Sequence, residues 1–130
     1  MPLHYTRVMF IRHKQKEILS INFSEVTYDE FLVEIKKARD IISQQPPQSI
    51  RILTNLKQLR VNKEMIKTFK EYIELNKPFV LACALFGVSE QTKVLFQTVI
   101  ALAHRDIQIF DTEEQAKDWL AEQKEAPPQP

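Results

Sequence analysis

The stretch ALFGVSEQTKVLF, residues 84–96, contains the only glycine of the chain and resembles many phosphate-binding turns. An apolar run, then Gly87, Val88 and Ser89, then an amphipathic segment predict a strand, a tight turn and a helix. A dinucleotide fingerprint needs several glycines, so nucleotide binding by that route is excluded. Two interpretations stay open: Gly87 turns the chain while Ser89 caps the helix, or the free amides of the turn hold a small anion.

Residue types that support catalysis or metal binding are sparse. Histidines stand at positions 4, 13 and 104 without an HxxxH pair or a neighbouring cysteine, so we expect no metal site. Cys83 lies alone in an apolar run, which favours a buried structural thiol. Glu113 and Glu114 open a predicted helix, where acids complement the helix dipole. We therefore expect no catalytic residue, no cofactor and no enzymatic activity.

Basic residues gather around one predicted helix. They are Lys57, Arg60, Lys63, Lys67 and Lys70, and Asn62 stands among them as the predicted cap. Lys63, Lys67 and Lys70 recur at helical spacing and share a face opposite the apolar stripe. Residues 111–125 carry six acids against two lysines, so the chain is polarised although its net charge is only +1. The basic face is either simply solvated or a surface for an acidic protein partner, which could be a second copy of the chain.

The helix predicted from Ser89 to about His104 is apolar around most of its circumference. Burial is the default explanation for such a helix. Two sharper hypotheses are a homodimer face and a pocket for a small apolar or lipid-like ligand. The residues of that face or pocket would be Phe86, Leu95, Phe96 and Val99.

These residues are positioned by nine predicted elements. The strands are expected near residues 5–13, 17–23, 49–56, 79–86 and 107–110, and the helices begin at the caps Thr27, Asn62, Ser89 and Thr112. The order β-β-α-β-α-β-α-β-α predicts a single α/β domain over residues 1–124, with a mixed, mostly parallel sheet of about five strands and about four helices. Residues 125–130 are expected to form a disordered, Pro-rich tail.

Composition agrees with one globular domain. The chain has 130 residues, 44% apolar and 27% charged, which suffices for a core without disulfides. No stretch has the length of a membrane span, and no signal peptide is recognised, so we expect a cytoplasmic protein. No aromatic residues interleave the clustered lysines, which argues against nucleic acid as a partner.

The element order, together with GVSEQTK at 87–93 and FDTEEQAKDWL at 110–120, resembles the STAS-like domain family related to bacterial anti-sigma-factor antagonists. The resemblance covers roughly residues 15–122. It implies a small α/β domain that binds protein partners, while some similar folds hold lipids or small anionic ligands. In the antagonists a phosphorylated serine stands at the start of the helix after the third strand. Here Asn62 and Lys63 occupy that place, so the resemblance implies an interaction module without the phosphoserine switch.

Overall fold

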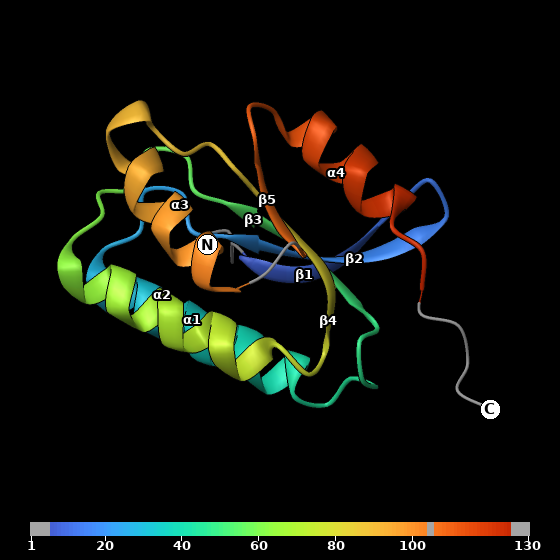
Figure 1. Ribbon diagram of the computed structural model, residues 1–130. Helices are drawn as coiled ribbons and strands as arrows, with labels where there is room; N and C mark the ends of the chain where they lie inside the picture. Colours follow the sequence, from blue (N-terminus) through green and yellow to red (C-terminus); the bar gives the residue numbers. More distant parts are fainter. Residues whose placement is uncertain (1–5, 104–105, 126–130) are drawn as a thin grey trace, which may run out of the picture.

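The computed structural model describes residues 6–103 and 106–125 (Figure 1). Its elements are β1 (Val8–His13), β2 (Lys16–Asn22), α1 (Tyr28–Ile42), β3 (Ile50–Asn55), α2 (Lys63–Asn76), β4 (Val80–Phe86), α3 (Glu90–Ala103), β5 (Ile107–Phe110) and α4 (Glu113–Glu122). This order confirms the predicted α/β domain with a five-stranded sheet and four helices. Tyr5, His104 and residues 126–130 of the predicted tail lie outside the described residues.

The strands lie side by side in the order in which they occur in the sequence. β1 pairs antiparallel with β2, and every following pair is parallel. From β2 to β5 each strand lies next to the one before it, always on the same side. Because the connections between parallel strands are right-handed, the three connecting helices all lie on one face of the sheet. Figure 1 shows α1, α2 and α3 on that face and α4 on the other.

The sheet therefore separates two apolar layers. The larger layer lies beneath α1, α2 and α3 and contains Phe31, Phe69 and Phe96, while the smaller lies beneath α4 and contains Leu53, Phe86 and Leu120. β4 contributes to both, because Cys83 and Leu85 point to the first layer and Ala82, Ala84 and Phe86 to the second. This alternation explains why the predicted strand 79–86 is apolar throughout, and it confirms that β4, an interior strand between β3 and β5, is covered on both faces.

Each helix begins at the cap that the sequence predicts. Thr27 and Thr112 form capping boxes, Asn62 accepts a hydrogen bond from the Met65 amide, and Ser89 accepts one from the Thr92 amide. α1, α2 and α3 follow parallel strands directly. Their N-termini therefore meet at the edge of the sheet where those strands end.

No helix within the described ranges combines the length and the apolar character that crossing a membrane requires.

Candidate functional site

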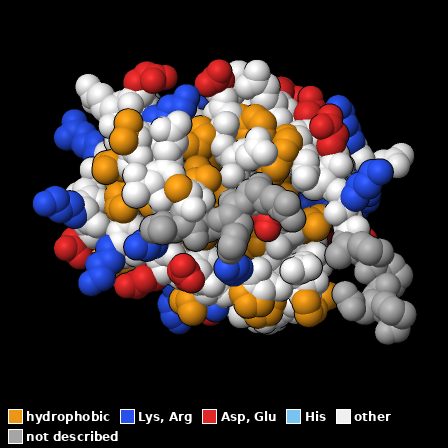
Figure 2. Space-filling view, in the orientation of Figure 1, with side chains coloured by type: hydrophobic (Ala, Val, Ile, Leu, Met, Phe, Trp, Pro, Cys, Tyr) orange, Lys and Arg blue, Asp and Glu red, His pale blue; other side chains and the backbone are white. Residues whose placement is uncertain are grey.

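Five cations lie in the loop after β3 and along α2, and we call this set the basic edge: Lys57, Arg60, Lys63, Lys67 and Lys70. All five are exposed, and within residues 6–103 and 106–125 none of them lies in an ion pair. Figure 2 shows several Lys and Arg side chains on the left of the molecule, where α2 begins. The basic face predicted from sequence is thus solvent-accessible and unneutralised in the described part of the chain.

The backbone adds positive potential at the same place. α1, α2 and α3 begin at this end of the sheet, and a helix N-terminus carries about half a positive charge. The Lys57 ammonium lies 5.7 Å from the centroid of the Phe86 ring, over its electron-rich face. The five cations and the helix dipoles favour an acidic group, whereas the first turns of the three helices already carry Asp29, Glu30, Glu64 and Glu90.

A shallow, open depression adjoins the basic edge between the loops that follow β2 and β3. Its volume is about 460 Å³, and its lining includes Val26, Tyr28, Gln58, Arg60, Asn62 and Met65. Arg60 and Asn62 thus join the charged surface to a partly apolar recess. A partner could place a side chain there while its acidic groups meet the neighbouring lysines.

Two matched turns hold the loops of this region. The Asn22 side chain accepts a hydrogen bond from the Ser24 amide at 2.9 Å, and the Asn55 side chain accepts one from the Lys57 amide at 2.9 Å. Asn22 and Asn55 are direct neighbours in the β2–β3 ladder. The sequences NFSEV and NLKQL are therefore two copies of one turn, a repeat that our sequence analysis did not recognise. Its signal is an Asn at the end of each strand, with apolar residues one and four positions later.

The turn at Gly87, Val88 and Ser89 has a structural explanation. Gly87 has φ +83°, and a Cβ there would lie 2.5 Å from Lys57 Cγ and 2.8 Å from the Lys57 backbone nitrogen. The Ser89 hydroxyl accepts a hydrogen bond from the Thr92 amide at 3.3 Å and lies 2.8 Å from the Thr92 hydroxyl. These contacts favour the turn-and-cap interpretation, because the serine is engaged within its own helix.

The structure does not bring together the four side chains expected to form one pocket or dimer face. Phe86 packs beneath α4, whereas Phe96 and Val99 lie in the layer on the other side of the sheet. Leu95 is 45% exposed on the outer side of α3. The prediction that these four side chains form one face or pocket is therefore wrong. Strand and helix periodicity direct them to three different environments. The exposed apolar part of α3 is instead Val94 and Leu95, of which Val94 is 67% exposed.

A His–carboxylate cluster joins the first hairpin to α4. His13 Nε2 lies 2.7 Å from Asp118 Oδ1, and Lys14 Nζ lies 3.0 Å from the same oxygen. Hydrogen bonds from His13 and then Lys14 hold the pKa of Asp118 below its usual value. Glu114 brings a third group that could ligate a metal within 4.8 Å, but Lys117 lies 3.6 Å from its carboxylate. The two lysines already neutralise the carboxylates, so we interpret the cluster as an ion-pair network.

The single cysteine fits its predicted role. Cys83 is buried in β4, and burial raises the pKa of its thiol to about 12. A thiol with so high a pKa is protonated at neutral pH and is therefore a weak nucleophile. It is a structural side chain of the core.

Comparisons of this chain with protein-family models, curated proteins and solved structures find no match. The likeness to STAS-like proteins therefore rests on the sequence pattern and on the element order. The surfaces of the chain, foremost the basic edge, are the features from which its function can be inferred.

Proposed function

We propose that this chain is a non-enzymatic, STAS-like interaction module that binds an acidic protein partner through the basic edge. The observation that carries the proposal is the set of five exposed cations without an ion-pair partner in the described ranges. Like charges held together on a surface repel one another. An acidic partner would relieve that repulsion.

Intramolecular ion pairs engage four other Lys and Arg side chains of the described residues. Lys14, Lys37 and Lys117 each lie within 4.0 Å of an intramolecular carboxylate, and Arg51 has Glu125 at 3.8 Å. Lys36, Lys77 and Lys124 are also exposed and outside any ion pair of the described residues, so the basic edge differs from them by the recurrence of its cations along one helix. Three helix N-termini beside the basic edge strengthen the field, and the adjoining depression offers a recess for a partner side chain.

Binding through this surface should be constitutive. In the antagonists that the sequence resembles, a phosphoserine at the start of the corresponding helix controls the encounter. In this chain the position is Asn62, whose side-chain oxygen accepts the Met65 amide at 2.8 Å as a helix cap. An amide side chain provides no hydroxyl for a kinase, so the switch is absent from this position and regulation would act on the partner.

Affinity capture from an extract of the source cells tests the proposal. Three forms of the chain serve as bait: wild type, Lys63→Glu/Lys67→Glu, and the control Lys36→Glu/Lys124→Glu. Both variants change the net charge equally at exposed lysines, but only the first alters the basic edge. We expect wild type and control to retain the same acidic protein, released as salt rises, because screening acts over about 8–10 Å at physiological ionic strength. Equal recovery by all three baits would reject the basic edge as the partner surface.

A further inference from the structure

A hollow lies at the end of the sheet opposite the basic edge, between the starts of β2 and β3. β2 begins at Lys16 but pairs with β3 only from Leu19 onward, and β3 begins at Ile50 but enters that ladder at Ile52. The two strands are therefore not paired with each other ahead of this point, and the hollow opens between them. Figure 1 shows the β1–β2 hairpin and the chain after α4 at this end of the sheet. The hollow has a volume of about 370 Å³, and its lining includes Lys16, Glu17, Ser49, Ile50, Arg51 and Glu125.

The guanidinium of Arg51 gives this hollow a fixed positive charge. The Arg51 side chain is 4% exposed, and its Nε and Nη2 donate to the carbonyl oxygens of Leu120 and Gln123. Among the described residues, these are the hydrogen bonds that the side chain makes, and Nη1 takes part in neither. A guanidinium keeps its charge in proteins, and a buried charge is costly without a counter-ion. Nη1 is therefore the donor that remains for an anion.

The chain itself places a carboxylate near this nitrogen. Glu125 Oε1 lies 3.8 Å from Arg51 Nη1, which is within reach of an ion pair but longer than a hydrogen bond. The Glu125 side chain is 71% exposed and also lines the hollow, so Nη1 is approached from the open side. Such an exposed ion pair contributes little to stability. Glu125 thus shows which chemical group this position accepts, and a carboxylate that binds more closely would displace it.

The charges around the hollow are not balanced. Arg12 and Glu17 are direct neighbours in the β1–β2 ladder, so their opposite charges offset each other. Of the other charged side chains in the lining, Lys16 and Arg51 are positive and Glu125 is negative. Lys16 lies in no ion pair within the part of the chain that the structure describes. The lining therefore has one cation more than it has anions, which favours an anionic occupant.

One side of the hollow is apolar. It contains Phe10, Pro46 and Ile50. The Phe10 side chain is 39% exposed, and covering its ring would remove apolar surface from water. An occupant that carries a hydrocarbon part besides its acidic group therefore gains additional binding free energy.

We propose that this hollow binds a small organic acid whose carboxylate takes the place of Glu125 at Arg51 Nη1. Lys16 pairs with the same carboxylate, and the hydrocarbon part packs against Phe10 and Pro46. The bound acid releases the Glu125 side chain into solvent, so Glu125 acts as an internal competitor for the site. This site lies away from the basic edge and does not rest on the proposed protein partner.

Titration with an acid and its neutral counterpart tests this site. The probes are 3-phenylpropanoate and 3-phenylpropanamide, which share a shape and differ in charge, and amide NMR spectra report binding. We expect the acid to shift the signals of Lys16, Ser49 and Arg51 and to bind at least about fivefold more tightly than the amide. Lys16→Gln should weaken acid binding about two- to fivefold and leave amide binding unchanged. Lys36→Gln, at an exposed position outside the hollow, should change neither affinity.

Glu125→Gln tests the displacement itself. Because it removes the competing carboxylate, it should strengthen acid binding about two- to fivefold. Glu122→Gln is the matched control, since it removes the same charge from a nearby exposed residue that does not line the hollow. Arg51 is kept in all variants because its hydrogen bonds to the end of α4 also support the fold.

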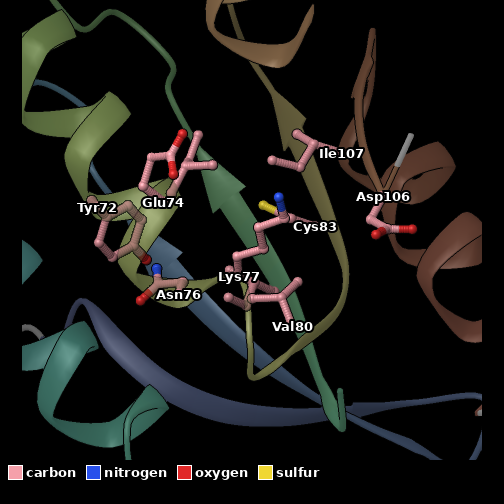
Figure 3. Close-up of a pocket in the computed structure, with 10 residues that line it drawn as sticks. Tyr72, Glu74, Asn76, Lys77, Val80, Cys83, Asp106 and Ile107 are labelled. Carbon is pink, nitrogen blue, oxygen red and sulfur yellow. The ribbon is translucent and has the colours of Figure 1, made fainter. Parts of the chain in front are cut away.

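The hollow beneath the C-terminal half of α2 provides an internal reference. Figure 3 shows its lining, which includes Tyr72 and Ile107 and shares no residue with the hollow at Arg51. The amide signals of Tyr72 and Ile107 should stay in place during the titration. The proposal is wrong if the acid moves these signals in place of those at Lys16 and Arg51, or moves none at the highest concentration. Equal affinities of acid and amide, or equal acid affinities of Glu125→Gln and Glu122→Gln, would also overturn it.

Discussion

Gly87 lets its turn pack closely against Lys57 of the basic edge. Its φ of +83° lies in the left-handed region, and a Cβ would meet both the side chain and the backbone of Lys57. Backbone atoms cannot rotate away as a side-chain tip can. The spacing of the loops after β3 and β4 therefore depends on this residue having no side chain.

Gly87→Ala should accordingly destabilise the fold by roughly 2–3 kcal/mol, through left-handed strain and displacement of the Lys57 loop. Urea unfolding measures the change. Ser89→Ala provides the comparison and should cost about 1 kcal/mol as the loss of an N-cap. If Gly87→Ala costs no more than Ser89→Ala, the close approach to Lys57 is not a constraint on the fold.

The ionisation of Asp118 makes the free energy of unfolding depend on pH in the acid range. Hydrogen bonds from His13 and Lys14 lower its pKa below the usual 3.8, so the charged carboxylate stabilises the folded state. That contribution is complete above the unfolded pKa and is lost as the pH falls through the lower, folded pKa. Asp118→Asn should therefore be less stable than wild type near neutral pH, and the difference should shrink below about pH 4. Unfolding free energies of the two proteins measured across that range check this, and a difference independent of pH would contradict it.

At the scale of the element, α4 is held by a buried arginine from another part of the chain. Arg51 of β3 is 4% exposed, and its Nε and Nη2 donate to the carbonyl oxygens of Leu120 and Gln123 at 3.0 and 2.8 Å. These carbonyls belong to the last turn of α4 and to its C-cap residue, Gln123, whose own amide also donates to the Leu120 carbonyl at 3.3 Å. The guanidinium thus ends the helix and fixes it to the sheet.

Arg51→Met should destabilise the protein by about 2–4 kcal/mol, because two charge-assisted hydrogen bonds are lost and the Gln123 carbonyl loses its donor. Hydrogen exchange should show that α4 amides lose protection more than those of α1. Arg12→Met is the control, since its one hydrogen bond to the Gln15 carbonyl is exposed. Uniform loss of protection across all helices would show that Arg51 does not hold α4 in particular.

Sequence reasoning succeeded where the determining contacts are local. Each capping side chain accepts a hydrogen bond from the amide three residues later, so the local sequence alone predicts the caps Thr27, Asn62, Ser89 and Thr112. Contacts between distant residues were missed. Arg51 and Leu120 are 69 positions apart, and His13 and Asp118 are 105 apart. The prediction that Phe86 and Phe96 share one pocket was wrong for the same reason, because periodicity separates the two faces of β4 but does not tell which face α3 covers.

The whole molecule carries its two charged surfaces on different sides. The acidic α4 covers one face of the sheet, and the basic edge adjoins the helices of the other. Contact between the basic surface of one copy and the acidic surface of another would be heterologous and would form rings or open chains rather than a two-fold dimer. A closed homodimer therefore needs another surface, and the exposed Val94 and Leu95 of α3 are the candidates.

Light scattering at high micromolar concentration should then report a dimer for the wild-type chain and a monomer for Val94→Lys/Leu95→Lys. Both residues are exposed, so the fold should survive, unlike a change at Phe96, which is 2% exposed in the core. Leu75→Lys, at a 58% exposed position on α2, should remain a dimer. If light scattering reports a monomer for the wild-type chain, the prediction that α3 forms a dimer face is wrong.

The central claim is that an acidic protein covers the basic edge, and lysine footprinting of the captured complex tests it directly. The free chain and the complex are treated briefly with an acetylating reagent, and modification at each lysine is compared by mass spectrometry. We predict that Lys57, Lys63, Lys67 and Lys70 lose most of their reactivity in the complex, whereas Lys36 and Lys124 keep theirs. Unchanged reactivity at the first four, or protection confined to Lys36 and Lys124, would contradict the claim.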